Sequence, residues 1–261
     1  NLLEFSAIAG SALSPTLSGL TASLIHWRAT FLVSTLFVAG ALAWVILTRR
    51  VLETVIHGTL AQQKPDGESS PASVRIGTNA HSRPPRTAPM LIAYAAAFIL
   101  SFTWAGFLST ALPLYGGEVL GVPTPTLGMI FTAGLLVDLV LLLPVGWLSD
   151  RLDPRAMLTP AMLLMAGGLA WLPTSHSLEA LLLLSIVLHT SFAAWGMPSA
   201  ALALLARGEH LGQVLGVYRF LVDGAVVIAP WLIGTLIGRY GYGMPAWLTA
   251  GGVLVTAVVV A

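Results

Sequence analysis

Long apolar runs alternate with short polar breaks along most of the chain. Reading the runs between charged residues and prolines predicts eight helical spans, at residues 5–25, 28–48, 90–112, 125–148, 156–173, 178–205, 211–238 and 244–261. Most runs are close to the ~20 residues that cross the ~30 Å hydrocarbon core of a bilayer as an α-helix. Membrane β-strands would alternate in polarity, and these runs do not. The pattern predicts an all-α, polytopic membrane helix bundle.

A long polar stretch divides the predicted helices into two groups. Residues 49–89 combine five prolines with glycines, serines and a high density of charge, a composition typical of a linker. Its first part has helical apolar spacing and predicts a helix on the membrane surface. Residues 1–48 then form one helical group and residues 90–261 another. Because an apolar run begins so soon after Asn1, we expect that preceding helices are missing from this chain.

Composition places these helices in lipid. Of the 261 residues, 56% are hydrophobic and only 9% are charged, whereas soluble domains carry about 25% charged residues. The net charge of +1 provides no basic face for nucleic acid. The sequence has no cysteine, which excludes disulfides and thiol catalysis. It contains no glycine-rich phosphate loop, H-E-x-x-H pair or ATP-binding motif, so we expect no metal, no cofactor and no enzyme.

The distribution of basic residues predicts the orientation. Most of the 12 Lys and Arg lie in the linker and in the loops after the fourth and sixth spans. Loops rich in Lys and Arg stay on the cytoplasmic side of a membrane. We therefore expect the linker and both ends of the helical array to face the cytoplasm, in the inner (cytoplasmic) membrane.

The loop after the fourth span holds the strongest motif, which begins at Gly146 and ends at Arg155. It resembles the G-x-L-(A/S)-D-(R/K) loop of the major facilitator superfamily, with matches at Gly146, Leu148, Ser149, Asp150, Arg151 and Arg155. In this interpretation the glycine lets two helices approach and Asp150 attracts a helix N-terminus, as in a gate. Asp153 and Pro154 depart from the family pattern. The alternative is an ordinary charged turn.

The first span carries a second resemblance to this family. Its small residues and proline are similar to the G-x-x-x-G-P-x-x-G-G motif of the family's fifth helix, at Gly10, Ser14, Pro15, Ser18 and Gly19. Small residues four apart allow two helix backbones to touch. In the family this motif is associated with exporters that exchange substrate for protons. Here Ser14 and Ser18 replace two of its glycines.

The resemblance extends over nearly the whole chain and implies a fold and a function. The eight spans would be the family's helices 5 to 12, and residues 49–89 its central cytoplasmic loop. Helices 1 to 4 would be the missing partners. The implied function is secondary active transport of a small molecule by alternating access, with proton-coupled export as in bacterial members. The alternatives are a non-transporting scaffold or sensor, or an integral-membrane enzyme.

Charged residues inside the spans are candidates for a substrate or proton site. They are Asp138, Arg219 and Asp223, and each costs about 2.5–3.5 kcal/mol in a membrane helix unless it is partnered or hydrated. Arg219 and Asp223 are four residues apart and share a helix face. Such a pair is either part of a functional site or a structural bridge.

The sixth predicted span contains two further features. His189 lies in its middle and is either a proton relay or a packed, hydrogen-bonding residue. The sequence Gly196-Met197-Pro198 predicts a kink.

Overall fold

A computed structural model of the chain describes residues 14–62, 87–149, 151–206 and 211–261. Within these ranges the regular structure is entirely helical, without a strand. Six of the described helices are long and apolar enough to cross a membrane, and a further apolar helix, Leu178–Phe192, is shorter. The predicted all-α membrane bundle is confirmed.

The chain divides into two compact units, one of Asn1–Ser23 with Pro85–Ala261 and the other of Leu24–Pro84. In the second unit, α2 (Ala29–Gln62) is one continuous helix. Its apolar part, Ala29–Thr48, is long enough to span a membrane. The helix continues past residue 48, so the first part of the polar stretch is helical, as its apolar spacing predicts.

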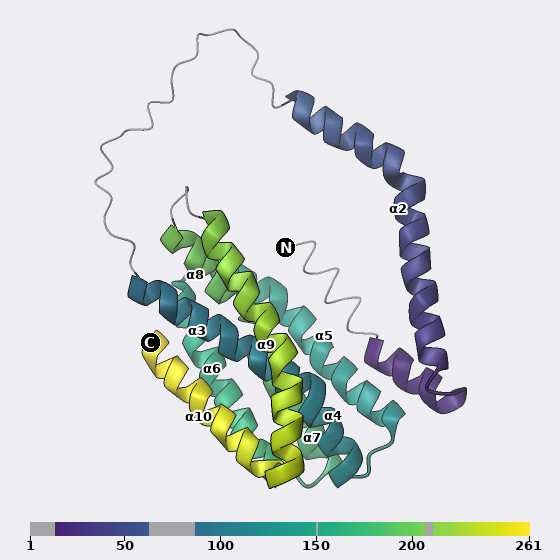
Figure 1. Cartoon of the computed structure of the whole chain (residues 1–261), viewed down its shortest axis with the longest axis vertical. Helices are drawn as coiled ribbons and strands as arrows, with labels where there is room; N and C mark the ends of the chain where they lie inside the picture. Colours follow the sequence, from purple (N-terminus) through teal and green to yellow (C-terminus); the bar gives the residue numbers. More distant parts are fainter. Residues whose placement is uncertain (1–13, 63–86, 150, 207–210) are drawn as a thin grey trace. The chain divides into compact units, whose positions relative to one another are not determined.

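The larger unit is a helical bundle (Figure 1). Besides the helical residues 14–23 it contains α3 (Thr87–Thr103), α5 (Thr124–Ser149), α6 (Pro154–Trp171), α7 (Leu178–Phe192), α8 (Met197–Ala206), α9 (Leu211–Tyr240) and α10 (Gly243–Val260). Helix α9 packs against α3, α10 packs against α6 and α3, and α5 packs against α7. Helix α8 contacts α3, α6 and α9.

Local sequence signals set several helix ends. The Ser177 hydroxyl accepts a hydrogen bond from the N–H of Ala180 and caps the start of α7. At the other end of a span, α9 stops at Gly241, whose φ of 73° is favourable only for glycine. The N–H of Gly241 still donates to the carbonyl of Ile237, and α10 begins two residues later.

The span at residues 87–119 is not a regular α-helix. After α3 it continues as the π-helical segment η1 (Trp104–Ala111), the short α4 (Leu112–Leu114) and a second π-helical segment, η2 (Tyr115–Val119). In η1 the N–H of Leu112 donates to the carbonyl of Phe107, five residues earlier. Pro113 lies between the two segments and has no N–H to donate, which favours a shift in hydrogen-bond register at this place.

The span predicted at residues 178–205 is interrupted. Residues 193–196 form turns between α7 and α8. In place of the helical ladder, the N–H of Trp195 donates to the carbonyl of Phe192 at 2.8 Å. The break directly precedes Met197 and Pro198, where the sequence predicts a kink.

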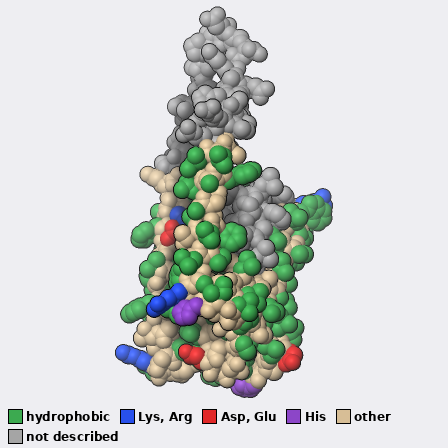
Figure 2. Space-filling view, turned by 90° about the vertical axis from the view of Figure 1, so that its right-hand side faces the viewer, with side chains coloured by type: hydrophobic (Ala, Val, Ile, Leu, Met, Phe, Trp, Pro, Cys, Tyr) green, Lys and Arg blue, Asp and Glu red, His purple; other side chains and the backbone are tan. Residues whose placement is uncertain are grey.

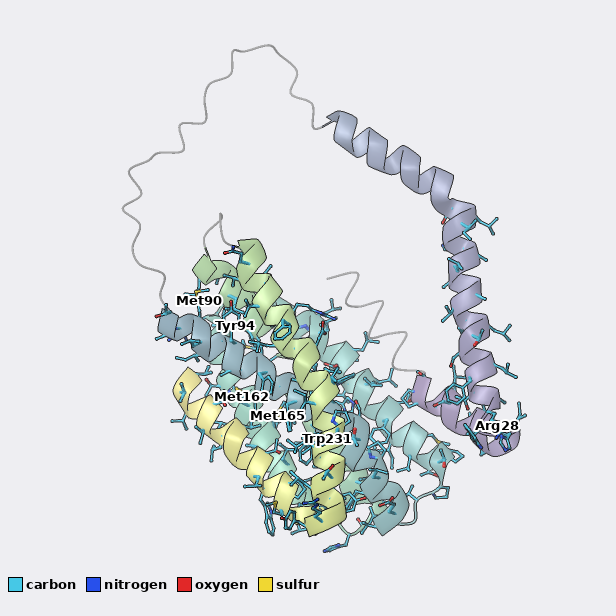
Figure 3. All side chains as sticks on the ribbon, viewed as in Figure 1. Arg28, Met90, Tyr94, Met162, Met165 and Trp231 are labelled. Atoms are coloured by element: carbon cyan, nitrogen blue, oxygen red, sulfur yellow. The ribbon has the colours of Figure 1, made fainter. Side chains whose placement is uncertain are left out.

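The core of the bundle lies between α3, η1, α6, α7 and α10. Met162 and Met165 of α6 are fully buried in it (Figure 3). A smaller cluster joins α3 to α8 and α9, and Met90 and Tyr94 pack against it (Figure 3). There the Tyr94 hydroxyl donates to the carbonyl of Val214 at 3.1 Å.

The outer surface of the bundle is also apolar. Figure 2 shows hydrophobic side chains over most of one face, with few charged groups among them. On α9, for example, Trp231 is 71% exposed (Figure 3). Large apolar patches of this kind are rare on soluble monomers, and a lipid environment explains them.

Candidate functional site

The two charged residues of α9 form an ion pair. The Nε of Arg219 donates to Oδ2 of Asp223 at 2.9 Å, and the side chains are 72% and 54% exposed. Both residues follow the start of α9 at Leu211, by about 12 and 18 Å along the helix axis. The structure thus confirms that Arg219 and Asp223 share a helix face, and it places the pair inside the span.

The exposure of this pair restricts what it can face. In lipid, each charge would cost about 2.5–3.5 kcal/mol on insertion scales. Charged residues in membrane spans therefore face a bundle interior or a hydrated pathway in almost all cases. Since other described helices do not cover the pair, the exposed side of α9 at this depth is a candidate polar surface.

Asp138, the third charged residue, lies half-buried on α5. Its depth follows from a neighbouring contact, because the backbone of Gly134, one turn earlier on α5, lies against the ring of His189 on α7. Helices α5 and α7 run in the same direction, because α6 lies between them in the chain and returns across the bundle. Asp138 therefore lies near the level of residue 193, where the break between α7 and α8 begins.

His189 is buried and is held by the backbone. Its Nδ1 lies 2.7 Å from the carbonyl oxygen of Ser185, which can only accept, so Nδ1 is the protonated nitrogen. A Cβ on Gly134 would lie 2.7 Å from Cε1 and 2.8 Å from Cγ of the ring. This environment fits the packed, hydrogen-bonding role for His189 and explains why α5 has a glycine at this position.

The motif loop connects α5 to α6. Gly146 and Trp147 lie in the last turns of α5, and the guanidinium of Arg151 stacks on the Trp147 ring, 3.9 Å from its centroid. Asp150 lies outside the described residues, so its role as a gate stays a prediction. Arg155 is exposed in the first turn of α6.

The two residues that depart from the family pattern start α6. Asp153 has an extended backbone, with φ −60° and ψ 135°, and its carboxylate accepts from the N–H of Arg155 at 2.9 Å. Pro154 follows at the first helical position, where a missing N–H costs nothing. An Asp-Pro pair before an apolar run is a helix-start signal, which could have been recognised in the sequence.

We expect Asp153→Ala to destabilise the start of α6 by about 1 kcal/mol, because the helix loses its N-cap. The thermal unfolding midpoint of the protein in lipid nanodiscs measures this loss. Asp153→Ser is the matched control, since a serine hydroxyl also caps, and it should restore most of the stability. An unchanged midpoint for Asp153→Ala would contradict the capping role.

The glycine-proline motif of the first span packs on α5. A Cβ on Gly19 would lie 2.9 Å from the carbonyl oxygen of Thr124, and Gly128 of α5 lies against the backbone of Pro15. The hydroxyls of Thr16 and Thr132 are 2.7 Å apart across the same contact. Two helix backbones therefore touch at this place.

The remaining residues of this motif have other positions. Ser18 donates its hydroxyl to the carbonyl of Pro15 within its own helix, at 3.1 Å. Ser14 is exposed at the first described position of the helix. Gly10 lies outside the described residues.

A hydrogen-bonded tyrosine cluster lies at the end of the bundle opposite the α5–α6 loop, and no motif in the sequence predicts it. The buried Tyr115 donates to the carbonyl of Ser175 at 2.8 Å, and Tyr242 donates to a carboxylate oxygen of Glu118 at 2.9 Å. The two rings meet edge to face, with centroids 5.1 Å apart. Burial and then the Glu118 carboxylate raise the pKa of Tyr242, so its hydroxyl stays protonated as a donor.

No group of three or more metal-ligating side chains occurs among the described residues. What the structure offers instead is an ion pair inside a span, a half-buried carboxylate on another span and a basic loop. These features define a polytopic helical membrane protein with charges inside the membrane.

Comparison with protein families then identifies the chain. Residues 94–261 match the profile of the Major Facilitator Superfamily, which is more than half of the sequence. The chain belongs to this family of membrane transporters. The predicted family is therefore confirmed, and the matched region contains the α5–α6 loop and α9. A comparison with curated proteins found no match.

Proposed function

We propose that this chain is part of a secondary active transporter that exports a small molecule in exchange for protons, in the inner (cytoplasmic) membrane. The observation that supports this function best is the exposed Arg219–Asp223 ion pair inside α9. Secondary transporters bind substrates and coupling ions near the membrane midplane. Because the ion pair is exposed at this depth, Asp223 can exchange Arg219 for a proton or for a substrate group.

In the proposed cycle, Asp223 accepts a proton or a cationic group and Arg219 competes with it. When Asp223 is charged, the guanidinium holds it at 2.9 Å. Protonation of the carboxylate removes the ionic attraction and frees Arg219 to move or to bind substrate. The two states differ in charge, so the proton gradient can drive the change between them.

The remaining predictions belong to the same proposal. Residues 1–48 and 90–261 would lie in the two halves that rock about the site, with residues 49–89 as the cytoplasmic linker. The first four helices of the amino-terminal half would complete the transporter. Asp150 would stabilise one state of the cytoplasmic gate through a helix N-terminus, an effect of about 0.3–2 kcal/mol. That is enough to shift a two-state equilibrium several-fold.

The test uses the intact protein in liposomes that contain a pH-sensitive dye. Addition of candidate small molecules should move protons across the membrane in the wild type. We expect Asp223→Asn to abolish this coupled proton movement and Asp223→Glu to retain part of it, both at normal abundance. Arg239→Gln is the matched control, because Arg239 is an exposed basic residue in the last turn of α9.

Two results would contradict the proposal. One is coupled proton movement by Asp223→Asn at the wild-type rate. The other is a loss of protein with Asp223→Asn that the second substitution Arg219→Gln repairs, together with full transport by the double variant. In that case the ion pair is only a structural bridge.

A further inference from the structure

The span at residues 87–119 ends in the short π-helical segment η2. There the N–H of Leu120 donates to the carbonyl of Tyr115, five residues earlier, at 3.2 Å. An α-helical hydrogen bond joins residues only four apart, so this turn holds one residue more than an α-helical turn needs. The same residues have a second pairing available, in which the N–H of Val119 donates to the Tyr115 carbonyl and closes an α-helical turn.

Two glycines leave the middle of η2 without side chains that would fix its register. A Cβ on Gly116 would lie 2.5 Å from Cδ2 of Leu127 and 2.9 Å from Cδ2 of Leu181, which are the ends of flexible side chains. Gly117 is exposed, and the nearest atom of another element to its Cβ position is Cδ1 of Leu127 at 3.8 Å. Glycine also has little preference for the α-helix, so rewinding this turn loses little at either position.

The tyrosine cluster holds both ends of η2. Tyr115, the buried first residue of η2, donates to the carbonyl of Ser175 at 2.8 Å. Glu118, three residues later, accepts from the Tyr242 hydroxyl at 2.9 Å. The wider π-helical turn advances by less per residue than the ~100° of an α-helix. With Tyr115 held in place, rewinding η2 as an α-helix therefore turns Glu118 further around the axis and away from Tyr242.

Tyr242 belongs to the turn between two other spans. It follows Gly241 at the end of α9 and directly precedes α10. Water competes for the bond between Glu118 and Tyr242, because Glu118 is exposed, whereas Tyr115 and Ser175 are buried. The Glu118–Tyr242 bond is therefore the one that opens first when the α9–α10 turn moves relative to η2.

We infer that η2 is a two-state register switch, which the Glu118–Tyr242 hydrogen bond holds in its π-helical state. A displacement of the α9–α10 turn breaks this bond and lets residues 115–119 rewind as an α-helical turn, with Tyr115 as the pivot. Because α9 also carries the Arg219–Asp223 pair, the switch transmits a movement of that helix to the span at residues 87–119. A two-state element of this kind is the physical basis of coupling between separated sites. The switch acts whatever the substrate and the coupling ion are.

Deletion of Gly117 tests whether η2 holds a surplus residue. Leu120 then follows Tyr115 by four residues, so the same N–H and carbonyl can form an α-helical hydrogen bond. We expect the full chain with this deletion, in lipid nanodiscs, to keep its thermal unfolding midpoint to within about 4 °C.

Deletion of Gly167 is the matched control. Gly167 is also an exposed glycine, with open space around its Cβ position, but it lies in the regular α-helix α6. Its deletion turns the rest of α6 by about 100° and moves the buried Leu169 out of the core. The midpoint should therefore fall by more than about 8 °C.

The hold on the π-helical state is measured as a distance distribution between two spin labels in the same nanodiscs. The chain has no native cysteine, so Val119→Cys in η2 and Leu178→Cys at the start of α7 place the labels at exposed positions. Tyr242→Phe keeps the ring and removes the hydroxyl. We expect it to raise the population of a second distance about two- to ten-fold over that of the labelled parent, the effect of one hydrogen bond. Tyr240→Phe is the control, since this tyrosine near the same turn is exposed, and it should leave the distribution unchanged.

A second variant reaches the same bond from its exposed side. Glu118→Ala should produce the same second distance, so the result does not depend on the folding of Tyr242→Phe. One unchanged distance distribution in both variants would overturn the role of the bond. A fall in the midpoint with the Gly117 deletion as large as with the Gly167 deletion would overturn the second register. Neither measurement uses a gradient or a substrate, so a failure of the proposed transport function would leave both results unchanged.

Discussion

Replacing Gly128 by valine is expected to separate the helix of residues 14–24 from α5 and to lower the stability of the bundle strongly. A Cβ at this position would lie 2.9 Å from the carbonyl carbon of Pro15 and 3.1 Å from Cα of Thr16, in addition to its contact with the Pro15 oxygen. These are backbone atoms, which a side-chain rotation cannot move. Overpacking in a tight contact costs about 1–3 kcal/mol, and the branched valine should reach the upper end.

The contact can be measured directly because the chain has no native cysteine. With Thr16→Cys and Thr132→Cys, whose hydroxyls are 2.7 Å apart in the native chain, oxidation should yield an intramolecular disulfide. Adding Gly128→Val should abolish most of this cross-link and lower the thermal midpoint. Gly224→Val is the control, since the space around Gly224 of α9 is open. Undiminished cross-linking with Gly128→Val would show that the two helices do not touch there.

The sequence predicts the spans because length and polarity are local properties. A run of about 20 apolar residues is suited to lipid whatever its neighbours are. Most predicted spans after residue 28 therefore agree with the structure, apart from the break at residues 193–196 and the continuation of α2 to Gln62. The pairing of Arg219 with Asp223 is equally local, since a four-residue spacing on a helix brings the side chains together. The structure confirms this pair at 2.9 Å.

The irregular segments depend on more than local sequence. The same apolar residues satisfy an α-helical and a π-helical register, and the register adopted depends on the packing around Pro113. Proline alone does not decide the register, because Pro144 lies inside α5, which remains an α-helix. The edge-to-face contact of Trp104 with Trp195, whose ring centroids are 5.8 Å apart, requires the relative placement of two spans, which one sequence does not reveal.

The candidate site also combines features that the local sequence predicts with features that form only in the assembled bundle. In-span charges make α9 and α5 candidate functional helices, because charges inside a membrane are costly. By contrast, the tyrosine cluster consists of residues from three separate parts of the chain. Tyr115, Ser175 and Tyr242 belong to no motif in the sequence and meet only when the bundle is assembled.

Gly134→Ala is expected to destabilise the bundle through His189, by about 1–3 kcal/mol. The new methyl group would collide with the imidazole ring, whose Cε1 and Cγ lie 2.7 and 2.8 Å from the position of that atom. The ring cannot turn away freely, because Nδ1 donates to the carbonyl of Ser185 at 2.7 Å. Gly167→Ala in α6 is the control, since its surroundings are open, and it should leave the thermal midpoint nearly unchanged.

A double-mutant cycle then tests whether His189 is the cause. His189→Ala alone removes a buried ring and should lower the thermal midpoint as well. When Gly134→Ala and His189→Ala are combined, the new methyl group on α5 no longer meets a ring, so the combined loss should be smaller than the sum by about 0.5–3 kcal/mol. Strict additivity would mean that Gly134 and His189 do not pack together. Such a result would remove the main support for a structural histidine and return His189 to the candidates for proton transfer.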